Sequence, residues 1–175
     1  MSSERASDSL VQNIVGLVRD GQKGLIVENG IRVIAIRAAA LQACIEKVVG
    51  AAGSIVAGTL LYQAGKEIGR ISFQSLEDQI GVPDDALRVI DTLVVDGGWG
   101  RCVDLAVGAR TYTVSIKDCP LCHERKSREP LCHMARGVAA GVLEAYLNKK
   151  AKNSKEVKCA AVSGDLCVFE VSFAD

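Results

Sequence analysis

The sequence predicts an α+β fold, in which an antiparallel sheet packs against helices gathered on one of its faces. Three observations support this prediction. Short β-branched runs occur in pairs separated by tight turns, longer segments with helical apolar spacing lie between the pairs, and strands and helices do not alternate singly. Such grouping into hairpins is typical of α+β proteins rather than of parallel α/β sheets.

A single domain is expected. The chain has 175 residues, of which 49% are hydrophobic and 24% charged, so it can bury a core without disulfides. Residues 1–9 are polar and are predicted to be a flexible N-terminus, and residues 10–175 to be the domain. The 21 Lys and Arg residues balance 21 Asp and Glu residues, so no positive field favours direct nucleic-acid binding.

The first half of the domain is predicted to contain helices and one hairpin. Asn29-Gly30, between apolar runs, is typical of a tight hairpin turn. Asp84 and Asp85 suit a helix start. Gly58, Gly65 and Gly69 would let another backbone approach their helix closely. The expected helices are 10–18, 38–49, 54–79 and from the Asp pair to about 95, and the expected strands are 25–27 and 31–36.

No membrane span is expected. Residues 48–65 carry no formal charge over 18 residues, close to the shortest span of about 17 residues. Their four glycines, with Ser54, Thr59 and Gln63, make the segment only modestly apolar. A closely packed helix is the preferred interpretation.

The second half is predicted to contain two hairpins around one helix. Gly137 and Gly141 place small residues on one stripe of that helix. The basic segment 149–155 is expected to be a solvated connector, and Ser163-Gly164-Asp165 to be the last turn. The expected strands are 101–107, 110–116, 156–162 and 166–173, and the expected helix is 131–147.

Cysteine usage indicates metal binding in a reducing compartment. There are seven cysteines, an odd number, and the first twenty residues lack a signal-peptide pattern, so the expected location is the cytoplasm. Clustered cysteines there more often bind metal than form disulfides. Cys44 and Cys102 are expected to be core residues.

Cys159 and Cys167 are symmetric about residue 163 in the last turn. In a symmetric hairpin they face each other with Cβ atoms about 4.5–5.5 Å apart. They could then bind one metal ion, form a cross-strand disulfide or be a buried apolar pair.

Cys119 and Cys122 form a second pair, in which the C-x-x-C spacing lets one loop supply two tetrahedral ligands. An exposed reducible pair is the alternative. Cys132-His133 follows ten residues later. His123 is expected to be solvated, and His133 to cap or orient rather than to ligate.

The closing part of the chain resembles the vinyl-4-reductase domain family. The resemblance rests on Pro130-Leu131-Cys132-His133, Glu156-Val157-Lys158-Cys159 and residues 163–171, with a weaker likeness at 62–69, and spans about residues 25–173. It implies a ligand-binding fold shared with Golgi vesicle-tethering subunits and nitric-oxide-sensing haem domains. It also implies a homodimeric small-molecule-binding domain, as in phenol-responsive regulators.

The resemblance implies a structural zinc held by Cys132, Glu156, Cys159 and Cys167, with Cys119 and Cys122 as tentative ligands. Glu156 lies three residues before Cys159, on the opposite strand face, so it can ligate only if the strand bends there. Cys119, Cys122 or His133 would otherwise complete the ligand set. An iron–sulfur cluster is the rival cofactor, because it also takes thiolates.

A pocket for a small hydrophobic molecule is expected between the helices and the sheet. Its candidate lining residues are Tyr62, Phe73, Trp99 and Tyr112, for which ordinary core packing is the alternative. No nucleophile–base pair or dinucleotide motif is present, so catalysis is not favoured.

The preferred hypothesis is a zinc-stabilised sensor domain that acts through a partner. The alternatives are a dimeric scaffold like the tethering subunits, and an accessory protein or reductase of tetrapyrrole or aromatic metabolism.

Overall fold

The computed structural model describes residues 17–20, 25–28, 31–34, 36–80, 86–162 and 164–174. Contacts divide the chain into two units, Met1–Ala40 and Leu41–Asp175. The single domain expected over residues 10–175 stays a prediction. The turn residues 29–30 and 81–85, and residues 10–16 of the first expected helix, lie outside the described residues.

The first unit contains a small antiparallel sheet. Its strands are β1 (Leu17–Asp20), β2 (Leu25–Glu28) and β3 (Ile31–Val33), in the order β1-β2-β3. The predicted β2 and β3 are confirmed, although β3 ends at Val33 rather than at residue 36. The helix expected over residues 10–18 is wrong at its end, because Leu17 and Val18 pair with Glu28 and Val27 in the sheet.

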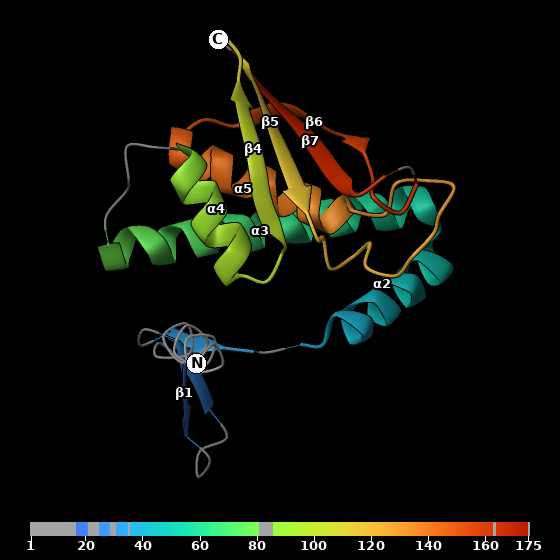
Figure 1. Cartoon of the computed structure of the whole chain (residues 1–175), viewed down its shortest axis with the longest axis horizontal. Coiled ribbons are helices and arrows are strands. Elements are labelled where there is room, and N and C mark those ends of the chain that lie inside the picture. The colour runs from blue at the N-terminus through green and yellow to red at the C-terminus, as the bar shows by residue number, and fades with distance from the viewer. Residues whose placement is uncertain are drawn as a thin grey trace, which may run out of the picture. The chain divides into compact units, whose positions relative to one another are not determined.

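The second unit is built from a four-stranded antiparallel sheet and helices (Figure 1). The sheet order is β4-β5-β7-β6, so the last two strands form a hairpin at one edge. The strands are β4 (Arg101–Val107), β5 (Thr111–Lys117), β6 (Ala151–Lys158) and β7 (Leu166–Phe173). The helices are α2 (Ala38–Ala52), whose first three residues belong to the first unit, α3 (Ser54–Ile80), α4 (Ala86–Asp96) and α5 (His133–Leu147).

These elements confirm the predicted α+β class with one correction. Residues 149–155 are not a solvated connector, because β6 begins at Ala151 and pairs with β7. The basic residues mislead because an edge strand exposes alternate side chains, and Lys152 and Lys155 are among the exposed ones. No helix among the described residues is long and apolar enough to cross a membrane.

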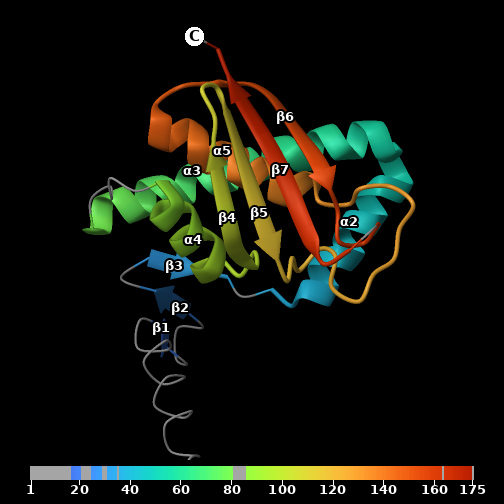
Figure 2. The ribbon, with the colours of Figure 1, turned by 45° about the horizontal axis from the view of Figure 1, so that its top comes forward.

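Helix α5 lies between the sheet and α3 (Figure 2). Its residues from Val138 to Leu143 are all buried. The core between helix and sheet also contains Val114, Phe169 and Val171, each 0% exposed. A helix that is buried on several sides must be apolar almost all round, as α5 is.

Four glycines allow α3 and α5 to touch backbone to backbone. A Cβ added to Gly65 would lie 2.1 Å from the Met134 carbonyl oxygen, and one on Gly141 would lie 2.1 Å from the Lys66 carbonyl oxygen. Gly69 and Gly137 are equally close to the facing backbone. The predicted close approach at Gly65 and Gly69 is therefore confirmed, whereas Gly58 faces the His133 ring.

An ion pair closes the far end of the same helix contact. The Lys66 Nζ atom lies 2.7 Å from Glu144 Oε1, which also accepts the Ala151 N–H at 2.8 Å. Glu144 thus joins α3, α5 and the start of β6.

Gly141→Ala is expected to lower the free energy of unfolding by about 3 kcal/mol, because the new methyl group collides with backbone that cannot move aside. Urea denaturation measures this. Gly50→Ala is the control, since nothing lies within 4 Å of its added Cβ in α2. It should raise stability by about 0.5–1 kcal/mol. Equal midpoints for wild type and Gly141→Ala would contradict the packing argument.

Candidate metal centre

Five cysteine side chains meet at the end of the sheet next to the start of α5. Cys132 and Cys167 are 0% exposed, and the other three are between 2% and 6% exposed. None of them forms a disulfide. They come from four places in the chain, namely the loop after β5 (Cys119, Cys122), the residue before α5 (Cys132), the residue after β6 (Cys159) and the second residue of β7 (Cys167).

The sulfur atoms are close enough to share one ion. Cys122 Sγ lies 3.0 Å from Cys132 Sγ, 3.4 Å from Cys159 Sγ and 3.6 Å from Cys167 Sγ. Cys132 Sγ is also 3.5 Å from Cys119 Sγ and from Cys167 Sγ. A zinc ion with Zn–S bonds of about 2.3 Å separates its sulfur ligands by about 3.8 Å, so these spacings suit a slightly contracted tetrahedral site.

The C-x-x-C loop turns tightly enough to present both sulfurs. The Cys122 N–H donates to the Cys119 carbonyl at 3.0 Å, and the Arg125 N–H donates to the Cys122 carbonyl at 3.1 Å. Gln42 of α2 donates to the Pro120 carbonyl at 2.6 Å, and Arg125 pairs with Glu46 at 2.7 Å. These contacts attach the loop to α2.

The last hairpin brings Cys159 opposite Cys167 as its symmetry predicts. Lys158 pairs with Val168, so the next position on each side is Cys159 and Cys167. Cys159 lies just beyond β6, and the Ala160 N–H donates to Cys167 Sγ at 3.4 Å. The predicted proximity is thus met by a turn residue rather than by a second strand residue.

A β-bulge supplies the bend that Glu156 requires. Glu156 pairs with Phe169 and Lys158 with Val168, so two residues of β6 advance against one of β7. The extra residue turns Glu156 toward the cluster, where its Oε2 accepts the Cys132 N–H at 3.0 Å. Its Oε1 is buried without a hydrogen-bond partner among the described residues.

The crowded thiols divide their protons unequally. Hydrogen bonds from Cys119 and the neighbouring thiols lower the pKa of Cys122, and hydrogen bonds to Cys119 and Cys122 raise the pKa of Cys132. Burial, followed by the nearby charge of Cys159, raises the pKa of Glu156 to about 9. A cation among these groups would stabilise their ionised forms, which is the condition that a metal ion satisfies.

Two overlapping sets of four side chains can bind a metal ion. One is Cys119, Cys122, Cys132 and Cys167, and the other is Cys132, Glu156, Cys159 and Cys167. Within each set the ligand atoms lie within 4.8 Å of one another. All six sequence-predicted ligands therefore meet in one place, and Cys132 and Cys167 belong to both sets.

The remaining cysteines lie apart from the cluster. Cys102 is a buried core residue on β4, as expected, and burial raises its pKa to about 11. The expectation for Cys44 is wrong, because it is exposed on α2 while its neighbour Ile45 is buried. His123 is 70% exposed, as expected of a solvated side chain.

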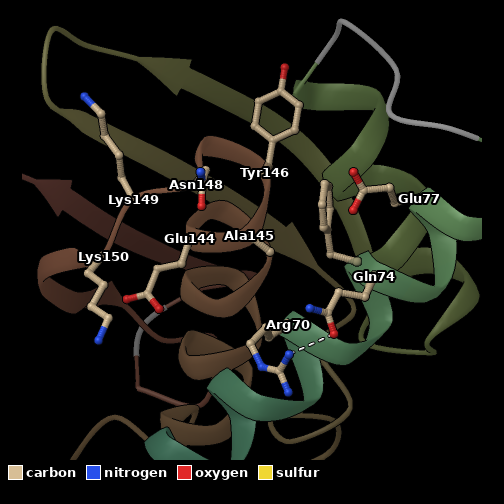
Figure 3. A pocket seen from close by; sticks show the side chains of 10 residues that line it. Arg70, Gln74, Glu77, Glu144, Ala145, Tyr146, Asn148, Lys149 and Lys150 are labelled. Carbon is tan, nitrogen blue, oxygen red and sulfur yellow. Dashed lines mark hydrogen bonds between the residues drawn. The ribbon is translucent and has the colours of Figure 1, made fainter.

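One of two cavities lies between α3 and the end of α5. It has a volume of about 680 Å³, and Arg70, Gln74 and Glu77 of α3 face the last turn of α5 across it (Figure 3). Lys149 and Lys150 line its other side (Figure 3). Its wall is mostly charged, apart from Phe73 and Tyr146, whose rings pack edge to face at 6.2 Å.

The second cavity, of about 510 Å³, lies beside the cysteine cluster. It is bounded by the start of α3, the first turn of α5 and the bulged part of β6. Its lining residues are Ser54, Ile55, Gly58, Thr59, Glu129, Pro130, His133, Arg136, Lys155, Glu156 and Val157.

The four aromatic residues predicted to line a pocket are dispersed. Phe73 lines the larger cavity, and the other three line neither cavity. Tyr62 stacks against Arg136, and Tyr112 packs edge to face on Phe173. Trp99 follows a tight turn in which Gly98 has a left-handed backbone (φ 69°), so its glycines serve the turn.

Sequence analysis did not single out Arg136. It lies one helical turn after Cys132 and lines the smaller cavity, but in the sequence it resembles any cation on a helix. The spacing from Cys132 was the available signal, because residues four apart share a helix face.

Comparisons with known proteins agree with this fold. The phenol-responsive sensory domain of the transcription activator PoxR, solved with phenol, is similar with a TM-score of 0.75 and 20% identity, over 99% of this chain and 91% of that one. Subunit 3 of a trafficking protein particle complex from Naegleria fowleri, covalently bound to palmitic acid, has a TM-score of 0.62 and 15% identity, over 79% and 93% of the two chains. At these identities the likeness shows the fold alone.

Two proteins of Methanocaldococcus jannaschii are also similar. A vinyl-4-reductase family protein of known structure has a TM-score of 0.52 and 21% identity, over 100% of this chain and 99% of that one. A curated protein without an assigned function is 29% identical over 117 residues, which are 66% of this chain and 65% of that protein.

The family match covers β5, α5 and the last hairpin, together with the loop between β5 and α5. It begins at residue 112 and ends at residue 173, so it contains Glu156 and all five clustered cysteines. Residues 112–173 of this chain form a vinyl-4-reductase domain.

Proposed function

We propose that this protein is a small-molecule sensor domain in which a structural zinc ion joins α5 to the last hairpin. The observation that supports this most strongly is the group of five buried sulfur atoms from four chain segments. An ion held there would fix the start of α5, the end of β6 and the start of β7 together.

Zinc suits the donors better than other divalent ions do. Thiolates are soft ligands, which zinc accepts and which magnesium and calcium do not. The proposed ligands are Cys132, Cys159, Cys167 and Glu156, with Cys119 and Cys122 able to replace Cys159 and Glu156. All the sulfurs are buried, which favours a closed structural site over a catalytic one with an open position.

An iron–sulfur cluster is the rival occupant, since five cysteines exceed the four that one zinc ion takes. The two are distinguished by colour, because zinc–thiolate sites are colourless whereas iron–sulfur proteins absorb visible light. A reducing compartment such as the cytoplasm would keep the thiols available for either.

The sensor assignment is supported by the fold and by the cavities. The PoxR sensory domain shares the fold, and its structure contains phenol. The present chain has cavities of about 680 and 510 Å³, within the range of small-molecule sites. Output to a partner protein is then required, because no catalytic pair accompanies either cavity.

A dimeric scaffold is the second candidate, and an exposed apolar stripe on α3 favours it. Val56, Leu60, Ile68 and Ile71 are 54%, 56%, 37% and 50% exposed. Their spacing places them along one side of the helix, away from the glycines that meet α5. An apolar stripe of this kind suits a homodimer interface.

Wild-type protein is expected to carry about one zinc ion per chain, and Cys132→Ser and Cys167→Ser to lose most of it, because both possible ligand sets include these residues. Elemental analysis of desalted protein measures the content. Cys44→Ser is the control and should keep its zinc, since this thiol is exposed and distant from the cluster. Full zinc content in both cluster variants would remove the site.

The same measurement distinguishes the two ligand sets. If the ion uses the all-cysteine set, Cys119→Ser and Cys122→Ser lose zinc whereas Glu156→Gln and Cys159→Ser retain it. The reverse pattern assigns the set with Glu156.

Removing the metal with a strong chelator is expected to lower the thermal midpoint by about 10 °C, because an ion that joins three segments contributes several kcal/mol. Calorimetry with and without chelator tests this. Re-addition of zinc should restore the midpoint, and the Cys132→Ser variant should not respond to either treatment. An unchanged wild-type midpoint after complete metal removal would contradict a structural role.

Leu60→Lys is expected to convert a dimer to a monomer of 18.5 kDa, because it places a charge in the centre of the apolar stripe. Light scattering after gel filtration reports the mass. Gln63→Lys, an exposed polar position on the same helix, is the matched control and should stay dimeric. A monomeric wild-type protein would contradict the scaffold function.

A further inference from the structure

The smaller cavity contains polar atoms that the described residues leave without partners. His133 Nδ1, Arg136 Nε and Glu156 Oε1 are buried and have no hydrogen-bond partner among the described residues, and all three residues line this cavity. Buried polar atoms without partners cost free energy, so native proteins normally pair them. Three together at one cavity indicate that a ligand completes them.

Arg136 is held so that one edge of its guanidinium group stays available. The group lies over the Tyr62 ring, 4.7 Å from its centroid, which sets the plane. Its Nη1 donates to the Ser154 carbonyl at 3.1 Å, which sets the rotation within that plane. The Nε side is the edge whose hydrogen has no partner among the described residues. A guanidinium edge with two parallel N–H groups matches the two oxygens of a carboxylate.

The rest of the cavity adds one more cation and an apolar wall. Lys155 lines it from β6, and His133 contributes its unpaired ring nitrogen. Ile55, Pro130 and Val157 provide apolar surface, and Gly58 leaves room above the His133 ring. A ligand would therefore need a charged head for Arg136 and a small apolar body.

We propose that this cavity binds a small monocarboxylic acid with an apolar body, whose carboxylate is held by the Nε edge of Arg136. The proposal deepens the sensor function and rests on its small-molecule part, while the metal is a separate matter. Glu129 and Glu156 also line the cavity. Their like charge disfavours a second carboxylate or a phosphate, which limits the ligand to a single negative charge.

Benzoate is the probe, and benzamide is its neutral isostere. Backbone amide shifts of the isotope-labelled wild-type protein are followed as each is added up to about 10 mM, well above a millimolar Kd. Benzoate should shift the amides around the cavity, such as Gly58, His133 and Val157. Benzamide should bind about tenfold more weakly, because it forms no charge-assisted pair with Arg136.

Arg136→Gln removes the charged edge and should weaken benzoate binding by about tenfold, and Arg136→Lys should recover only part of the loss, since a lysine lacks the paired N–H groups. Arg70→Gln, which changes the arginine of the larger cavity, is the matched control and should bind like wild type. Thermal midpoint and zinc content are recorded on each variant to show that it is folded.

The proposal is overturned if benzoate shifts no cavity amides, if the shifts map to the larger cavity, if benzamide binds equally well, or if Arg136→Gln binds like wild type. The wild-type mapping decides the matter even if the Arg136 variants do not fold. Zinc content is measured in the same samples. Loss of the carboxylate proposal with zinc present therefore differs from failure of the metal site, in which zinc is absent whatever benzoate does.

Discussion

The loop after β5, the start of α5, the turn after β6 and the start of β7 meet at one group of five buried sulfur atoms, and the second half of the fold depends on that meeting. The group takes segments that are up to 48 residues apart in the chain, from Cys119 to Cys167, and places them within one ion's reach. Thiols buried this closely compete for protons, so the arrangement is most stable when a cation holds the thiolates. An occupied site would therefore act as a local core, in place of the apolar side chains that would otherwise pack there.

The contact between α3 and α5 is the second constraint. Gly65, Gly69, Gly137 and Gly141 leave no space for even a methyl group, so the two helices lie closer than larger side chains would allow. That closeness buries α5 between α3 and the sheet and fixes the height of its first turn. Cys132 at that turn can then reach the sulfur cluster, while Arg136 and His133 reach the smaller cavity. The helix packing and the two sites are thus one arrangement.

Glu156 is the residue that the cluster and the cavity share. One of its oxygens accepts the Cys132 N–H, the other is buried without a partner among the described residues, and its side chain lines the cavity. Whether the ion uses Glu156 or the Cys119–Cys122 loop, the choice changes one wall of the cavity. A ligand in the cavity and an ion in the cluster are therefore expected to influence each other's affinity, since both contact the same carboxylate.

The sequence by itself determined the α+β class, the bounds of most helices and strands, the small-residue stripes and the identity of the candidate metal ligands, because these follow from local periodicity, turn residues and spacing. Local patterns could not say that residues 17–18 and 151–155 are strands, since strand pairing is decided by partners distant in the chain. Spacing could not decide whether the C-x-x-C loop joins the other cysteines or whether Glu156 turns toward them. The tertiary structure decided both, through contacts of the loop with α2 and a bulge in β6. It also decided that the predicted aromatic residues are dispersed and that Arg136 lines the cavity, because a cavity is a property of packing between segments rather than of any one segment.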